Sequence, residues 1–225
     1  MATLQAQDFS ERSPLYPRHA GARLGQLGNA AVVAGYGDDE GTQLQRCALI
    51  DLSNLARVGF RGNAAAEYLQ TRGYRLPDRP NQAQPQEDGS LVARLSQSEY
   101  LLLGSLRDAG SRIQLEEAGW QLGDSANYLL PRQDSHAWLL LTGGHASEVM
   151  AKLCGVDLRA EAFPPGSVAQ TSAARINAIV INAAQGELPC LQLLCDRASA
   201  SYFWDALLDA MAEFDGRPAG IDALL

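Results

Sequence analysis

The chain has 225 residues, of which 46% are hydrophobic and 20% charged, so it can bury the core of one large domain or two small ones. Its 26 Asp and Glu residues outnumber its 18 Lys and Arg residues, which gives a formal net charge of -8. Because an acidic surface repels phosphate backbones and anionic lipid headgroups, we expect no nucleic-acid partner and no membrane partner. The sequence shows neither a signal-peptide pattern nor an apolar run long enough to span a membrane, which predicts a cytoplasmic protein.

Motifs for catalysis and metal binding are missing from the sequence. It contains no nucleophile elbow, zinc-protease motif, phosphate-binding loop or dinucleotide-binding fingerprint. The four cysteines lie in apolar contexts without a CxxC pair, which favours buried, reduced thiols over a zinc site. We therefore expect no catalytic residue, no metal and no cofactor of its own in this chain.

The first 45 residues are rich in Gly, Arg and Gln. Two prolines within 13–18 argue against regular structure there, because proline lacks a backbone donor and restricts the residue before it. We predict that residues 1–45 form an extended arm that packs on the parent domain or on a partner subunit. A disordered tail is the alternative.

Regular patterns begin at Cys47 and define a first subdomain over 46–125. A segment rich in Pro, Gly and Gln, 73–89, predicts a surface loop. The predicted helices are 64–70 and 108–119, and the predicted strands are 47–52, 57–60, 91–95 and 99–103, of which the last two form a hairpin.

The second half, 126–225, repeats this plan. Residues 58–69 align with 139–150 at a constant offset that places Gly62 over Gly143, and each segment has the pattern of a strand, a glycine turn and a helix. The repeat predicts an α+β fold of two small sandwich subdomains, each an antiparallel sheet with helices on one face.

The later part of the second half predicts another hairpin. Its strands are 174–181 and 188–194, and its turn is Gln185-Gly186. A closing helix begins near residue 198 and carries an apolar stripe suited to lie on a sheet.

Four polar residues are candidates for lining a pocket. Asp88 lies in an acidic turn before a strand, where it could bind a basic nitrogen or simply be solvated. Arg175 and Asn177, with Gln170 nearby, occupy alternate positions on apolar strands. Such a face could line a pocket, or it could face water.

Three stretches of the second half resemble the gamma subunit of heterotetrameric sarcosine oxidase. They are Ser135–Gly143, Val149–Arg159 with its Leu-Cys-Gly-Val-Asp-Leu run, and Phe163–Arg175 with its Ala-Gln-Thr-Ser run. The resemblance is clear from about 128 to 212 and weaker from 47 to 106. There, Asp51-Leu52-Ser53 and Val58–Gly62 look like the opening of the wider superfamily, which includes the folate-dependent aminomethyltransferase of glycine cleavage. Ser13-Pro14-Leu15 is also similar to the gamma subunit.

The resemblance implies a folate-binding-type fold and a place in a bacterial heterotetramer that oxidatively demethylates sarcosine or a related N-methyl amine. It implies alpha, beta and delta partner subunits, which would carry the flavins, NAD, zinc and tetrahydrofolate. The gamma-type chain would then serve assembly and partner binding.

Two departures from the aminomethyltransferase pattern bear on chemistry. Where those enzymes have a paired Asp-Asp, only Asp88 aligns here, and Arg175 is followed by Ile-Asn-Ala instead of Thr-Gly-Tyr. We therefore predict a non-catalytic gamma-type subunit. The alternative is an autonomous tetrahydrofolate-binding transferase, in which Asp88 would hold the amine nitrogen and Arg175 a carboxylate of the folate tail.

Overall fold

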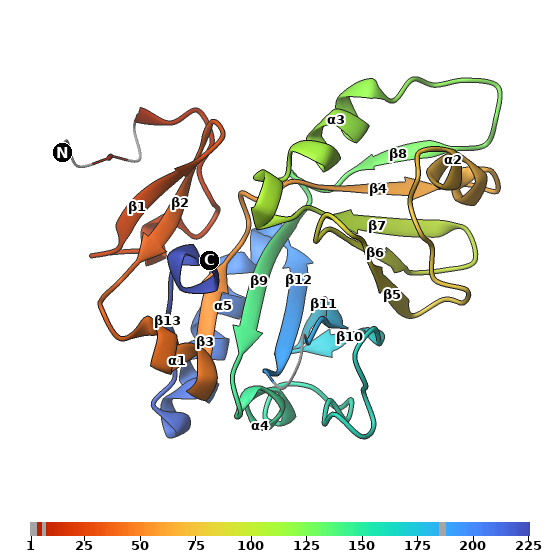
Figure 1. Ribbon diagram of the computed structural model, residues 1–225. Helices are drawn as coiled ribbons and strands as arrows, with labels where there is room; N and C mark the ends of the chain where they lie inside the picture. The colour runs from red at the N-terminus through yellow and green to blue at the C-terminus, as the bar shows by residue number, and fades with distance from the viewer. Residues whose placement is uncertain (1–3, 6–7, 185–187) are drawn as a thin grey trace.

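The computed structural model describes residues 4–5, 8–184 and 188–225 (Figure 1). This part of the chain forms two large sheets and a small two-stranded one. The first sheet has the order β5 (Gln82–Pro85), β6 (Leu91–Arg94), β7 (Glu99–Leu103), β4 (Arg57–Arg61) and β8 (Tyr128–Pro131). The second has the order β10 (Val168–Ala173), β11 (Ile176–Asn182), β12 (Cys190–Asp196), β9 (His136–Thr142), β3 (Ala48–Asp51) and β13 (Arg217–Pro218).

Helices cover the outer face of each large sheet, and the inner faces pack on each other. The helices are α2 (Ala65–Thr71) and α3 (Ser111–Gly119) on the first sheet, and α4 (Ala146–Ala151) and α5 (Ala200–Met211) on the second. On β7, Tyr100 and Leu102 pack with the helices, whereas Leu101 and Leu103 pack between the sheets against Trp138. This alternation follows from the opposite directions of successive side chains on a strand. The result is a helix–sheet–sheet–helix sandwich.

The predicted hairpins are present as β6–β7 and β11–β12. The turn predicted at Gln185-Gly186 lies outside the described residues. The predicted surface loop over 73–89, in contrast, contains the strand β5. This strand joins the two sheets at their edges, where Ala83 N donates to Gly166 O (2.7 Å) and Val168 N donates to Asn81 O (3.0 Å).

The two halves of the chain repeat the same strand register, but each half contributes one strand to the sheet of the other. β3 precedes β4 in sequence but pairs with β9, from Ala48↔Thr142 to Asp51↔Leu139. β8 precedes β9 but pairs with β4, from Tyr128↔Arg61 to Pro131↔Val58. Each half therefore completes the sheet of the other, so the predicted boundary at 125/126 does not separate the two sheets.

A glycine turn repeats at the start of each helix because the exchanged chain passes close by. Gly62 has φ +138°, and a Cβ there would lie 2.0 Å from Ala126 O. Gly143 has φ +107°, and a Cβ there would lie 2.5 Å from Arg46 O. Only glycine fits both the left-handed backbone and this approach.

Arg57 stabilises the place where the connection between β3 and β4 passes the connection between β8 and β9. Its side chain is fully buried and donates to Ser53 O (2.8 Å), Leu55 O (2.9 Å), Gln133 O (3.1 Å) and His136 O. Burial lowers the pKa of this guanidinium to about 10, so it stays charged at neutral pH.

The N-terminal segment differs from the predicted extended arm. It contains a short 3-10 turn at Tyr16–Arg18, a hairpin of β1 (Arg23–Leu27) with β2 (Ala30–Gly35), and the helix α1 (Glu40–Arg46). All six residues of β2 are buried. They pack beside the C-terminal turn at Ile221–Leu224, so the hairpin is part of the core.

No helix in the described ranges has the length and apolar character needed to cross a bilayer.

Candidate functional site

A cavity of about 790 Å³ lies between the two sheets. Its apolar wall includes Leu103 of β7 and Trp138 of β9, and the indole N–H of Trp138 donates to Gln192 Oε1 at 2.6 Å. The polar side chains around it are Arg75, Gln84, Gln86, Ser90, Arg107, Asn182 and Gln192. A volume of this size is in the range of small-molecule sites.

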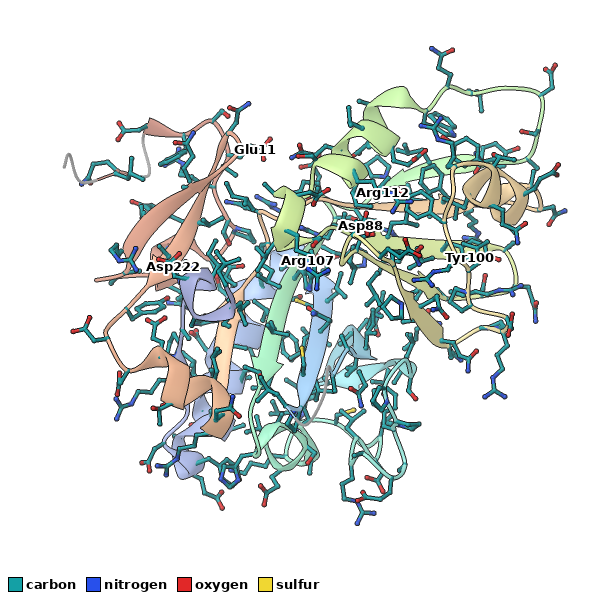
Figure 2. All side chains as sticks on the ribbon, in the orientation of Figure 1. Glu11, Asp88, Tyr100, Arg107, Arg112 and Asp222 are labelled. Atoms are coloured by element: carbon teal, nitrogen blue, oxygen red, sulfur yellow. The ribbon has the colours of Figure 1, made fainter. Side chains whose placement is uncertain are left out.

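The charged groups that line this cavity are both guanidinium groups. No Asp or Glu is among its described lining residues, and neither Arg75 nor Arg107 has an ion-pair partner among the described residues. Arg107, labelled in Figure 2, packs over Gly89, where a Cβ would come within 3.1 Å of its Cδ, and it is exposed to solvent. The described lining residues therefore carry positive charge, which favours anionic over cationic ligands.

Asp88, the aligned carboxylate, has its oxygens occupied and does not line the cavity, although Gly89 and Ser90 do. Its Oδ1 accepts from Ser90 N (3.0 Å) and Ser90 Oγ (2.7 Å), and its Oδ2 accepts from Arg112 Nη1 (2.7 Å; Figure 2). Burial alone would raise the pKa of Asp88, but the bonds from Ser90 and Arg112 outweigh it and lower that pKa. The carboxylate stabilises a turn and is a poor proton acceptor.

The structure brings Gln170 and Asn177 together but separates them from Asp88 and Arg175. Gln170 and Asn177 line a second groove, of about 480 Å³, on the inner face of the second sheet. Gln170 Nε2 donates to Leu95 O (2.7 Å) and Asn81 Oδ1 (3.0 Å), so it ties the two sheets together.

Arg175 is not on a strand. It is exposed at the tip of the β10–β11 hairpin, where Ala174 (φ +49°) and Arg175 (φ +66°) form a two-residue turn. The predicted alternating face therefore ends before Arg175, and neither of the two cavities is lined by it.

His136 also lines the second groove and is neutral at pH 7. Burial lowers its pKa to about 4, and the nearby Arg132 and Arg57 add to this effect. Its Nδ1 lies 2.8 Å from Ser135 Oγ, which in turn donates to Pro131 O (3.0 Å). The Ser135 hydroxyl proton is thus used by a backbone carbonyl, so this pair does not form an activated nucleophile.

A buried polar cluster under the N-terminal segment was not foreseen from the sequence. His19 Nε2 lies 2.9 Å from Asp51 Oδ2, and Ser13 Oγ donates to the same oxygen. His19 Nδ1 lies 2.7 Å from the Tyr36 hydroxyl, and the edge of Trp204 packs on the imidazole. Asp51 thereby holds both ends of the 13–19 segment.

The same cluster explains why two short motifs stood out in the sequence. Ser13-Pro14-Leu15 and Asp51-Leu52-Ser53 meet here, and Leu15 is fully buried. Burial alone would raise the pKa of the Asp51 carboxyl, but the bonds and charge of His19, with the bonds from Ser13 and Ser53, lower it. Since two of these three partners come from the N-terminal segment, the cluster anchors that segment.

The four cysteines are unpaired, and three of them are buried as predicted, whereas Cys190 is only partly buried. Burial raises the pKa of the thiols of Cys47 to about 11 and of Cys190 and Cys195 to about 12. These three thiols are therefore protonated and weakly nucleophilic at neutral pH. Within the described ranges, no three His, Cys, Asp or Glu side chains come close enough to hold a metal ion.

Comparison with known proteins identifies the family. Residues 81–225 match the family model described as the GCVT N-terminal domain. The chain belongs to this family. No curated protein matches it.

Solved structures with the same fold include two of this superfamily. A chain of the heterotetrameric sarcosine oxidase from Corynebacterium sp. U-96, in complex with pyrrole 2-carboxylate, is 19% identical with a TM-score of 0.66. The match covers 91% of our chain and 96% of that chain. The glycine cleavage system aminomethyltransferase T from Bartonella henselae is 17% identical with a TM-score of 0.72, and the match covers 95% of our chain but 60% of the transferase. These matches confirm the predicted fold class, and the family model confirms the predicted superfamily.

Proposed function

We propose that this chain is a non-catalytic, gamma-type subunit of a sarcosine-oxidase-like heterotetramer, and that it serves assembly and partner binding in the cytoplasm. The observation that carries the proposal is the match to 96% of one chain of such an oxidase. The aminomethyltransferase, in contrast, is matched over 60% of its length.

The geometry around Asp88 supports a non-catalytic role. A transferase that acts on an aminomethyl group needs a carboxylate or another base facing its substrate. Asp88 instead bonds Ser90 and Arg112, and the inter-sheet cavity presents two guanidinium groups without a described carboxylate. Among its described lining residues, such a cavity offers no carboxylate to hold an aminium ion.

In the proposed complex, the alpha, beta and delta subunits carry the flavins, NAD, zinc and tetrahydrofolate. The overall reaction is the oxidative demethylation of sarcosine or a related N-methyl amine. The chain contributes binding surface, for which its exposed apolar residues and its anchored N-terminal segment are suited.

The size of the cavity favours a second candidate, an autonomous tetrahydrofolate-binding protein of the aminomethyltransferase type. A volume of about 790 Å³ with two arginines admits an anionic ligand. In this candidate, Asp88 cannot hold the amine nitrogen and Arg175 cannot hold a folate carboxylate as the sequence predicted, because neither residue lines the cavity. It would have to use Arg75 and Arg107 for the folate carboxylates.

A native pull-down of the tagged chain from its source cells separates the two candidates. We expect flavin absorbance in the eluate and co-elution with a large flavoprotein, a smaller flavoprotein and a small zinc-binding chain. A colourless single chain that binds tetrahydrofolate, and loses that binding on Arg107→Gln, would instead establish the second candidate. Arg94→Gln is the matched control, because Arg94 bonds the 77–78 and 96–97 carbonyls and does not line the cavity.

A further inference from the structure

The outer edge of β8 distinguishes the first sheet from the second. In the second sheet, β13 covers the outer edge of β3, where Arg217 N donates to Cys47 O (3.2 Å) and Ala219 N donates to Leu49 O (3.0 Å). β8 is the counterpart of β3, since both have the same register on β4 and β9. Among the described residues, however, no strand lies beyond β8.

The backbone direction on β8 follows from the pairing of β4. Gly104 N donates to Ala56 O (2.8 Å), and Gly62 N donates to Ser98 O (2.9 Å). Within residues 56–62, the even-numbered residues therefore direct their backbone N–H and C=O groups toward β7. The odd-numbered residues 57–61 then face β8. Gly59 and Arg61 are opposite Leu130 and Tyr128, which leaves the N–H and C=O of Leu129 directed outward.

Two carbonyl oxygens at this edge are the counterparts of the oxygens that bind β13. By the common register, Asn127 O and Leu129 O correspond to Cys47 O and Leu49 O. Within the described ranges, neither receives a hydrogen bond from a turn, loop or cap. Because Asn127 is only 4% exposed, Leu129 O is the acceptor left for an added strand, as Leu49 O is for Ala219 N in the other half.

The surroundings of this edge are apolar and exposed. Tyr128 on β8 is 52% exposed, Leu122 in the connection before it 69%, and Leu115 on α3 71%. Figure 1 shows α3 and this connection beside the outermost strand of the first sheet. Soluble proteins protect such an edge with short strands, prolines, charges, bulges or a covering segment. β8 has only four residues and ends at Pro131, but its Tyr-Leu-Leu-Pro sequence carries no charge.

We propose that an extended, apolar segment of a partner subunit adds to the first sheet along β8, as β13 adds to β3. A backbone N–H of this segment donates to Leu129 O, and the Leu129 N–H donates to a backbone carbonyl of the segment. Its side chains cover Leu115, Leu122 and Tyr128. Strand addition of this kind takes affinity from main-chain bonds and selectivity from alternate side chains. The inference rests on the proposed role as a subunit of a larger complex.

Amide hydrogen exchange on the isolated chain and on the purified complex tests the inference. We expect the Leu129 amide to exchange fast in the isolated chain and roughly tenfold or more slowly in the complex. The amides of Arg217 and Ala219 already bond β3, so their exchange should be equal in the two samples. They are the internal control.

Two variants test the apolar surroundings. Leu122→Asp and Tyr128→Asp should each lower the affinity for the partner subunits about tenfold or more, with an unchanged thermal unfolding midpoint. Leu225→Asp is the matched control, since Leu225 is 82% exposed and lies at the C-terminus, and it should leave that affinity unchanged.

Each outcome separates the inference from the proposed function. If the complex forms but the Leu129 amide exchanges as fast as in the isolated chain, this inference is wrong and the subunit role stands. If no partner co-purifies, both fail. If the isolated chain is a dimer with a protected Leu129 amide, a second copy occupies the edge and the partner-subunit proposal is overturned.

Discussion

Replacement of Asp88 by Asn decides between a structural and a chemical role for this carboxylate. The side-chain amide oxygen of the variant can still accept from Ser90 N, so the turn before β6 is retained. The variant loses the ion pair with Arg112, whose side chain is 32% exposed against 26% for Asp88. For a partly exposed pair with good geometry, we expect a loss of about 1 kcal/mol in the free energy of unfolding.

Urea unfolding of wild type and variant at pH 7 measures this loss. Asp222→Asn is the control, because its ion pair with Arg23 is at least half exposed and should contribute only about 0.3 kcal/mol. Titration with tetrahydrofolate on the same samples should show no difference between Asp88→Asn and wild type. If the variant keeps full stability but loses folate binding, the structural interpretation of Asp88 is refuted.

The stability difference should also depend on pH. The folded state lowers the pKa of Asp88, so the stabilisation is fully present above the unfolded pKa of about 3.9. It disappears as the pH falls through the lower, folded-state pKa. The unfolding curves of wild type and Asp88→Asn should therefore converge only well below pH 4, and convergence already near pH 6 would contradict the assignment.

Three further predictions follow from contacts in the fold. Gly62→Ala should lower the unfolding free energy by about 3 kcal/mol or more, because the added Cβ meets a backbone oxygen. Gly73→Ala is the control: Gly73 has φ +81° and no atom within 4 Å of an added Cβ, so the loss should be about 1 kcal/mol. Equal losses in the two variants would exclude the close approach as the cause. Asp51→Asn should lower the unfolding free energy by about 3 kcal/mol, because it weakens the buried bonds to Ser13 and His19. Trypsin should then cut the 12–18 segment. Undiminished resistance to trypsin would contradict the role of Asp51 as the anchor of that segment. Cys47 and Cys195, which are buried and have raised thiol pKa values, should react with an aromatic disulfide reagent at pH 7.5 only after unfolding, so fast labelling of these two in the native chain would disprove their burial.

The sequence was most informative where local pattern and tertiary structure agree. The glycine turns at Gly62 and Gly143 and the two hairpins follow from local patterns of apolar residues and turn formers. The exchange of β3 and β8 could not be predicted, because an apolar run specifies a buried strand without naming its partner. Strand β5 was missed because its Pro and Gln residues give no strand pattern, and its backbone bonds to β6 and β10 stabilise it instead.

Candidate site residues were harder to predict for a related reason. The position of Arg175 depends on two left-handed residues, Ala174 and Arg175, at a turn that lacks the Asn-Gly signature of such hairpins. The roles of Asp51 and His19 depend on contacts between segments far apart in sequence. The cavity arginines have no sequence motif: Arg75 lies in a loop and Arg107 in a 3-10 turn, and they come together because both contact the 85–89 segment.

The strand exchange constrains how the polypeptide acquires its structure during synthesis. β4 cannot complete its pairing until residues 128–131 have left the ribosome, and β3 waits for residues 136–142. At synthesis rates of about 5–20 residues per second, β3 then stays unpaired for several seconds. An apolar strand left open for that long is a target for aggregation, and a chain truncated before residue 128 would expose both β3 and β4. Neither half of the molecule should therefore be obtainable as an independently soluble fragment.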